Sequence, residues 1–172
     1  DLTKEESITK LNLEEFDVYE LIKNISNDYM EISDIHEKKF SYSFNGNNPF
    51  IVSDKCKLRQ LLIIFIDNSF KYTNEGDNIN ISVNNKENIC IISIRDSGIG
   101  IDEKDINLVF DRFFRSDAVR ESGIDGSGIG LSIANMIVKS LKGNIKVHSK
   151  LNEGTEFNIT LPKKLKNNWF RK

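Results

Sequence analysis

A strongly apolar run that ends abruptly in acid and glycine is the feature that most limits how this chain can fold. Residues 88–95 carry β-branched side chains at both odd and even positions, which is typical of a strand buried on both faces of a sheet. Asp96 follows directly, and Gly98 and Gly100 allow the next turn to adopt positive φ and to approach a flat ligand closely. The pattern predicts a rigidly held carboxylate beside a planar molecule such as a purine, although a simple Asp-Gly turn that closes a strand fits the same residues.

The segments around this turn predict an α+β fold in one domain. Apolar residues recur at helical spacing over residues 17–36, and Asp54 can cap a second helix over residues 55–72. A third helix is expected over residues 128–141, where Gly143 ends it. Short or alternating apolar runs predict strands over residues 10–16, 40–44, 50–52, 79–83, 89–94, 145–147 and 157–161. We therefore expect a two-layer α/β sandwich, in which three helices cover a mixed, mostly antiparallel sheet.

Charge and cysteine content narrow the possible functions. The formal net charge of −2 gives no general attraction for nucleic acid, and no apolar stretch has the length needed to span a bilayer. Cys56 and Cys90 are far apart and lack the spacing of a metal site or a disulfide framework. We expect a cytoplasmic location, no nucleic-acid partner and no direct insertion into a membrane.

The two ends of the chain and one internal stretch are expected to differ from the domain itself, which we place at residues 11–162. Residues 1–10 are polar without a core-facing stripe, which predicts the trailing end of an upstream helix or linker. Residues 163–172 are basic and predict a solvated tail. Residues 115–127 have few apolar anchors, so we expect this stretch to be mobile.

Three short segments occur in one order along the chain, and their combination is far more specific than any of them alone. They are Asp67-Asn68-Ser-Phe-Lys71-Tyr72 in the second predicted helix, the Asp96 turn, and Gly126-Ser-Gly128-Ile-Gly130-Leu131 before the third helix. Over about residues 11–162 the chain resembles the catalytic ATP-binding domain of bacterial sensor histidine kinases, part of the GHKL superfamily with the Bergerat fold. In this resemblance the N box, the first, second and third glycine boxes and the phenylalanine box fall on residues 67–73, 95–101, 126–131, 153–155 and 110–115.

The resemblance implies an ATP site and a bound Mg²⁺. Asp96 would accept a hydrogen bond from the adenine amino group and disfavour guanine, while Asn68 would lend an amide oxygen to Mg²⁺. Tyr72 would contact the base or the sugar. The other residues expected to contact the nucleotide are Lys71, Gly98, Gly100, Ile101, Gly126, Ser127, Gly128, Ile129, Gly130, Leu131 and Thr155.

Three residues receive catalytic roles from the same resemblance. Lys71 would reach phosphate, although a solvated lysine on a helix face has the same appearance in sequence. Arg115 would approach the γ-phosphate and stabilise the transferring group. Asp67 would polarise an incoming histidine, although an ordinary surface acid is the alternative reading. The phenylalanines at 110, 113 and 114 are expected to anchor a lid rather than to take part in chemistry.

The implied function is transfer of the γ-phosphoryl group of MgATP to a histidine on an upstream dimerisation domain, followed by relay to a response regulator. Neither His36 nor His148 has the sequence context of the acceptor, so we expect it outside this chain. The isolated domain is expected to be a monomer and the full protein a homodimer.

Ile64 leaves two alternatives open. It lies one helical turn before Asn68, where many sensor kinases carry a second asparagine and hydrolytic relatives carry a water-activating glutamate. A degenerate ATP-binding regulatory module with little turnover is therefore one alternative. An ATP-hydrolysing GHKL clamp is the other, and isoleucine at this position disfavours it.

Overall fold

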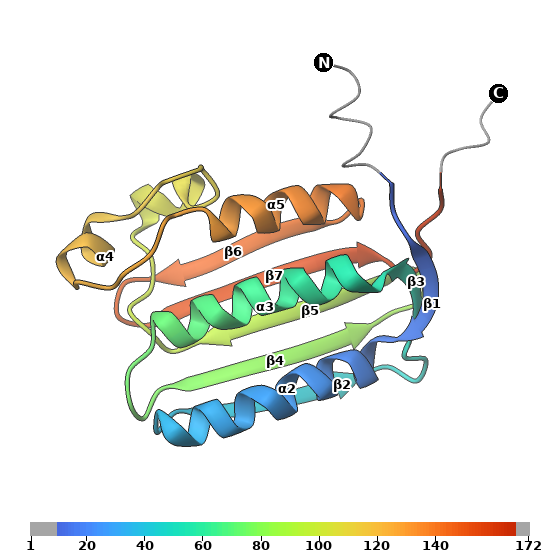
Figure 1. The fold of residues 1–172 in the computed structure, drawn as a ribbon, viewed down its shortest axis with the longest axis horizontal. Helices are drawn as coiled ribbons and strands as arrows, with labels where there is room; N and C mark the ends of the chain where they lie inside the picture. The colour runs from blue at the N-terminus through green and yellow to red at the C-terminus, as the bar shows by residue number, and fades with distance from the viewer. Residues whose placement is uncertain (1–9, 168–172) are drawn as a thin grey trace, which may run out of the picture.

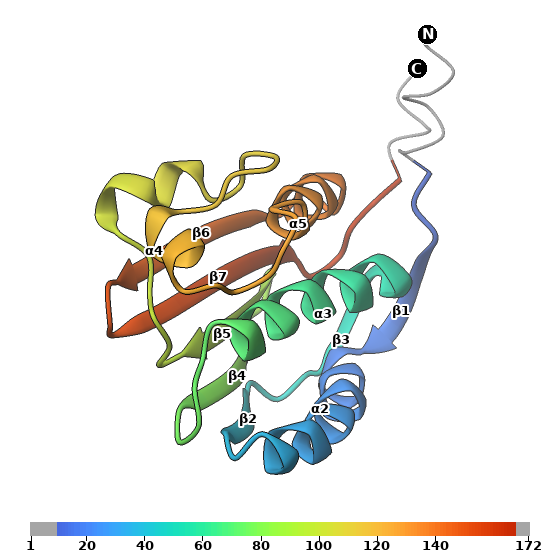
Figure 2. The same cartoon turned by 60° about the vertical axis from the view of Figure 1, so that its left-hand side comes forward.

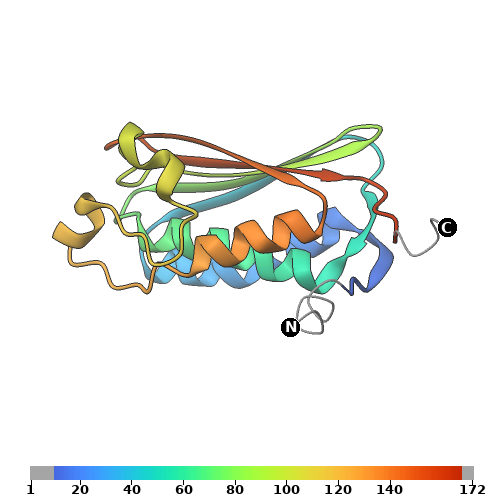
Figure 3. The ribbon, with the colours of Figure 1, turned by 90° about the horizontal axis from the view of Figure 1, so that it is seen from above.

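The computed structural model describes residues 10–167 and has two layers, a five-stranded sheet and a layer of helices on one of its faces (Figures 1 and 3). The sheet has the order β2-β4-β5-β7-β6. Its strands are β2 (Lys39–Asn45), β4 (Asn78–Asn85), β5 (Ile89–Asp96), β6 (Asn144–Lys150) and β7 (Gly154–Pro162). The longer helices are α2 (Val18–Ile35), α3 (Lys55–Lys71) and α5 (Gly130–Ser140). The predicted α+β fold class is confirmed.

The register of the sheet places the end of β5 at its centre. β2 pairs with β4 in parallel, whereas the other neighbouring strands are antiparallel. Asp96, the last residue of β5, stands opposite Ile79 of β4 and Thr155 of β7. The carboxylate predicted at a strand end is therefore held between two flanking strands.

Two aspartates begin the first two long helices, as their sequence context predicts. The side chain of Asp17 accepts a hydrogen bond from the Glu20 amide at 3.0 Å, and that of Asp54 accepts from the Lys57 amide at 3.0 Å. Each bond satisfies an amide that the first turn of a helix leaves without a backbone partner. Local capping chemistry therefore sets where α2 and α3 begin.

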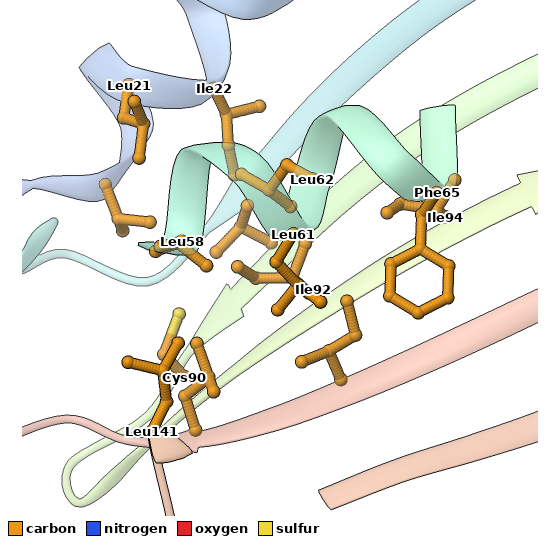
Figure 4. Close-up of a cluster of buried hydrophobic side chains, with 14 of the residues drawn as sticks. Leu21, Ile22, Leu58, Leu61, Leu62, Phe65, Cys90, Ile92, Ile94 and Leu141 are labelled. Carbon is orange, nitrogen blue, oxygen red and sulfur yellow. The ribbon is translucent and has the colours of Figure 1, made fainter. Parts of the chain in front are cut away.

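The core lies between α3 and the sheet (Figure 4). Leu58, Leu61 and Phe65 of α3 are fully buried and point toward the fully buried Ile92 and Ile94 of β5. Full burial of one such side chain is worth about 1.5–3 kcal/mol. This packing gives α3 and β5 a rigid relative position, and both elements end at the same side of the domain (Figure 1).

A small second sheet brings the two ends of the described chain together. β1 (Leu13–Asp17) pairs antiparallel with β3 (Phe50–Asp54), and the segment after β7 runs along β3 as well (Figure 2). The Asn12 amide also donates to Asp54 Oδ2 at 2.9 Å, while Asp54 Oδ1 caps α3. The N-terminal strand is therefore bonded to the residue that starts α3.

The expectation of a solvated tail is wrong for its first residues. The Val52 amide donates to the Lys163 carbonyl at 2.8 Å, and the Leu165 amide donates to the Val52 carbonyl at 2.9 Å. Lys163 and Leu165 are both buried. Leu165 joins the core because it alternates with two lysines along this extended segment. The rest of the predicted tail, residues 168–172, and residues 1–9 of the predicted upstream segment lie outside the described residues.

Two short helices were not predicted as such, and one predicted helix begins later than expected. η1 (Glu103–Leu108) forms the expected helical patch, and α4 (Asp117–Glu121) lies within the stretch that we expect to be mobile. Helix α5 begins at Gly130 because Gly128, with φ of +71°, still belongs to the preceding turn. Within residues 10–167, no helix combines the length and apolar character required to cross a membrane.

Candidate active site

The turn after β5 brings its backbone into direct contact with the end of α3. The Ile99 amide donates to the Tyr72 carbonyl at 3.0 Å. A Cβ atom on Gly98 would lie 2.0 Å from that same carbonyl oxygen, and one on Gly100 would lie 2.0 Å from the Lys150 carbonyl. Both positions therefore require glycine because the main chain passes so close. The turn joins the two elements that carry the predicted site residues.

Asp96 is buried in this turn with one carboxylate oxygen already engaged. Its Oδ1 accepts a hydrogen bond from the Gly98 amide at 2.9 Å. Burial raises the pKa of Asp96 above its usual range, while the Gly98 amide, the Ser69 hydroxyl and the Thr155 amide oppose that rise. The Ser69 hydroxyl is itself buried without a well-aligned hydrogen bond. The side chain is thus fixed in orientation, and its second oxygen remains available to a ligand.

A hollow beside Asp96 has a largely apolar wall. Its lining comes from α3, the glycine turn, the segment around η1 and α4, the start of α5, and β7. The residues are Asn68, Tyr72, Asp96, Ile99, Gly100, Ile101, Val109, Phe114, Arg115, Ser116, Val119, Leu131, Thr155 and Phe157. An apolar cleft with one buried carboxylate is suited to a flat ring that offers a hydrogen-bond donor at its edge.

A second hollow continues the first toward the glycine-rich segment before α5. The two share Asn68, Tyr72, Val109, Phe114 and Leu131, so they form one groove, which we call the α3–α5 groove. The second part adds Ile64, Asp67, Lys71, Gly126, Ser127, Gly128 and Gly130. The groove therefore runs from a buried acid at one end to glycines and a helix N-terminus at the other, where anions bind favourably.

Two cations lie at the glycine end of the groove. Lys71 Nζ lies against the backbone of Gly126 and 5.5 Å from the centre of the Tyr72 ring. Burial, and then the nearby charge of Arg115, lower the pKa of Lys71, while Asp125 opposes that shift. Arg115 donates to the Ile124 carbonyl. Two positive groups held this close together form a site that a multiply charged anion would stabilise.

The C-terminal end of α3 is also held from the opposite side. Lys38 Nζ donates to the Phe70 carbonyl at 2.5 Å and to the Thr73 carbonyl at 3.0 Å. A cation at this end of a helix interacts favourably with the helix dipole and with carbonyls that lack helical partners. Lys38 therefore helps to keep Lys71 and Tyr72 in place, a contribution that spacing along the sequence does not reveal.

The structure brings most of the predicted site residues together. All of them line the α3–α5 groove except Gly98 and Ile129. Gly98 instead allows the close passage of the turn past Tyr72, and Ile129 is the residue before α5. Four further wall residues were not predicted, namely Ile99, Val109, Ser116 and Val119. Val119 comes from α4, and a lone valine in a polar stretch carries no sequence signal for such a position.

The two histidines lie apart from the groove, and Asp67 lies at its edge. His36 caps the C-terminal end of α2 and is exposed. His148 stands opposite Glu156 on the sheet and lines a separate polar hollow. Asp67 is exposed and accepts a hydrogen bond from the Tyr29 hydroxyl.

Comparison with known proteins decides the family. The model for the family of histidine kinase-, DNA gyrase B- and HSP90-like ATPases matches residues 53–165. The chain belongs to this family. It is also 40% identical over 121 residues to the signal transduction histidine-protein kinase ArlS of Staphylococcus aureus. That match covers 70% of this chain and 27% of ArlS, so the chain spans about a quarter of the curated relative.

Solved histidine kinases of this family have the same fold. The nucleotide-free catalytic domain of ThkA aligns with a TM-score of 0.79 and 24% identity, covering 90% of this chain and 100% of that one. ShkA, solved at full length with AMPPNP, aligns with a TM-score of 0.79 and 23% identity over 89% of this chain and 31% of that one. ThkA in complex with the response regulator TrrA aligns with a TM-score of 0.75 and 23% identity, covering 94% of this chain and 48% of that one. Family membership and the similarity to ArlS identify this chain as the catalytic, ATP-binding domain of a histidine kinase.

Proposed function

We propose that this domain binds MgATP in the α3–α5 groove and donates the γ-phosphoryl group to a histidine on a separate dimerisation domain. The observation that carries the proposal is that three segments distant in sequence converge on one groove, with the buried Asp96 at one end and Lys71, Arg115 and glycines at the other. The spacing of these groups suits a nucleotide whose base and phosphates require opposite chemistry.

At the base end, the proposed contact is between the free oxygen of Asp96 and the adenine amino group. Guanine would present a carbonyl there, and two acceptors facing each other in a buried site are strongly disfavoured. Tyr72 and the apolar wall would cover the ring. The domain would therefore select ATP over GTP through one carboxylate.

At the phosphate end, Lys71, Arg115 and the amides before α5 would hold the triphosphate. The Asn68 side chain lines both parts of the groove and offers the neutral oxygen that Mg²⁺ accepts, while phosphate oxygens and water would complete the set. A bound Mg²⁺ would neutralise charge that develops during phosphoryl transfer. The contribution of the chain itself is then positioning and charge stabilisation.

The proposed transfer forms one bond and breaks another. An imidazole nitrogen of the acceptor histidine bonds to the γ-phosphorus while the bond from that phosphorus to the β–γ bridging oxygen breaks, and ADP leaves with its electron pair. Asp67 would accept a hydrogen bond from the N–H of the other ring nitrogen. We further propose that the acceptor precedes residues 11–162 in a homodimeric protein, and that a response regulator takes the phosphoryl group from it.

Incubation with γ-labelled ATP tests this function. We expect no acid-labile label on the chain alone, and label on an added helical-hairpin domain that carries the acceptor histidine. Lys71→Gln should abolish most of that labelling, whereas Lys104→Gln, at an exposed lysine of η1, should not. Label on His36 or His148 of the chain alone would refute the assignment of the acceptor.

A second candidate function is an ATP-binding regulatory module with little turnover. Ile64 favours it, because this side chain lines the phosphate part of the groove and its Cγ2 lies 3.7 Å from where a Cβ on Gly130 would be. An apolar group there supplies neither a metal ligand nor a base. Tight ATP binding without labelling of any hairpin acceptor would identify this function.

A further inference from the structure

We propose that Tyr29 is a positioning residue that orients the Asp67 carboxylate toward the acceptor histidine, an inference that rests on the proposed function. The Tyr29 hydroxyl, on α2, donates to Asp67 Oδ1, on α3, at 2.5 Å. The two residues are 38 positions apart in sequence. Their contact depends on the packing of α2 beside α3 on the same face of the sheet (Figure 1).

The Tyr29 ring is fixed by two other aromatic side chains. Its centre lies 5.4 Å from that of Phe70 on α3 and 6.2 Å from that of Phe40 on β2, and the latter two rings are 5.9 Å apart. Aromatic pairs at these separations add packing energy beyond simple burial. The hydroxyl is therefore presented to Asp67 from three separate elements, and a swing of the ring would disrupt all of these contacts.

The bond occupies one oxygen of Asp67 and leaves the other open. Asp67 is exposed beside Asn68, at the rim of the phosphate part of the groove, where a histidine on another domain can approach the transferred group. A carboxylate at a surface normally rotates freely. A single fixed donor limits that rotation and aims the second oxygen, as in sites where a third group orients the base.

The chemistry of tyrosine suits this role better than that of a cation. A phenol orients a carboxylate without neutralising it, so the charge that attracts the imidazole N–H is retained. Burial, followed by the hydrogen bond to Asp67, raises the pKa of Tyr29. Asp28 on α2 adds to this effect and Arg59 on α3 opposes it. The phenol is therefore a permanent donor at neutral pH.

The contact itself can be measured in the chain alone. With the tyrosines labelled by ¹³C at Cζ, the Tyr29 signal is assigned by its loss in Tyr29→Phe. In Asp67→Asn the Tyr29 phenol should titrate at lower pH than in the unaltered chain, because the neighbouring charge is gone. An unchanged titration would show that the two groups are not coupled and would overturn the proposal.

The positioning role is tested by phosphoryl transfer from γ-labelled ATP to the added hairpin domain. Tyr29→Phe should lower kcat about tenfold, the scale for an outer group that orients a reacting one, and leave KM for ATP nearly unchanged. Tyr29→Phe should have no further effect in an Asp67→Asn background. Tyr42→Phe, which removes a hydroxyl outside this contact, serves as the control.

The outcomes separate the two levels of inference. Normal transfer by Tyr29→Phe, or independent effects that multiply in the double variant, would leave the proposed function standing and refute the role of Tyr29. An equal rise in KM and fall in melting temperature would show a purely structural tie between α2 and α3, and refute it as well. Absence of any transfer by the unaltered chain would refute the proposed function, and the positioning role with it.

Discussion

Asparagine in place of Asp96 tests the base end of the groove with almost no change of shape. Asp96 Oδ1 accepts from the Gly98 amide, and the other oxygen is proposed to accept from adenine. An asparagine has a single acceptor for these two donors. Whichever way its amide is turned, its NH₂ group faces either the Gly98 N–H or the adenine amino group. Asp96→Asn should therefore weaken ATP binding without large rearrangement of the turn.

The expected loss follows from this count of donors and acceptors. A hydrogen bond to a charged group, replaced by a buried donor without a partner, costs about 1–3 kcal/mol, which is about a 5- to 150-fold rise in Kd. Calorimetric titration with ATP and with GTP measures it, and Asp34→Asn at an exposed site of α2 is the matched control. Unchanged ATP affinity in a folded Asp96→Asn protein would place the adenine ring elsewhere.

The same variant has a predictable pH signature. The pKa of Asp96 is raised in the folded state, so the folded protein holds this proton more tightly than the unfolded chain does. The contribution of Asp96 to stability is therefore most favourable at acid pH and decreases as pH rises through the window between the ordinary and the raised pKa. Relative to the unaltered chain, Asp96→Asn should gain melting temperature across that window, and a gain that is independent of pH would contradict the argument.

Three further predictions concern other parts of the groove. Gly98→Ala should lower the free energy of unfolding by about 1–3 kcal/mol because its Cβ would lie 2.0 Å from the Tyr72 carbonyl, whereas Gly130→Ala, with 3.7 Å to the nearest atom, should be tolerated in a denaturant titration. Limited proteolysis should cut residues 115–127 first and more slowly with saturating ATP, and cleavage unaffected by ATP would argue against a nucleotide-ordered lid. The chain should hydrolyse ATP near background, and Ile64→Asn should strengthen Mg²⁺-dependent nucleotide binding when read beside melting temperature; brisk hydrolysis by the unaltered chain would instead indicate a hydrolytic clamp.

Sequence reasoning succeeded where the determinant is local. The caps at Asp17 and Asp54 depend on residues within one helical turn, and the Asp96 turn follows from glycines directly beside the acid. The order of the three segments then indicated that they share a site. These features are encoded within short stretches, so they can be read without knowing how distant parts of the chain pack.

Features that depend on distant contacts were missed for the same physical reason. Leu165 is buried only because its strand runs along β3, and Val119 reaches the groove only because α4 folds over it. Lys38 contacts the end of α3 from more than thirty residues away. No periodicity within a short segment encodes such pairings, and the parallel pairing of β2 with β4 is of the same kind.

The double use of Asp54 gives the domain a mechanical property. One oxygen holds the first turn of α3, and the other holds the backbone of Asn12 beside β1. Helix α3 has 17 residues, so it is a rod of about 25 Å with Lys71 at its far end. A sideways displacement of β1 acts directly on one end of this lever, and the opposite end is the wall of the groove that carries Asn68 and Lys71.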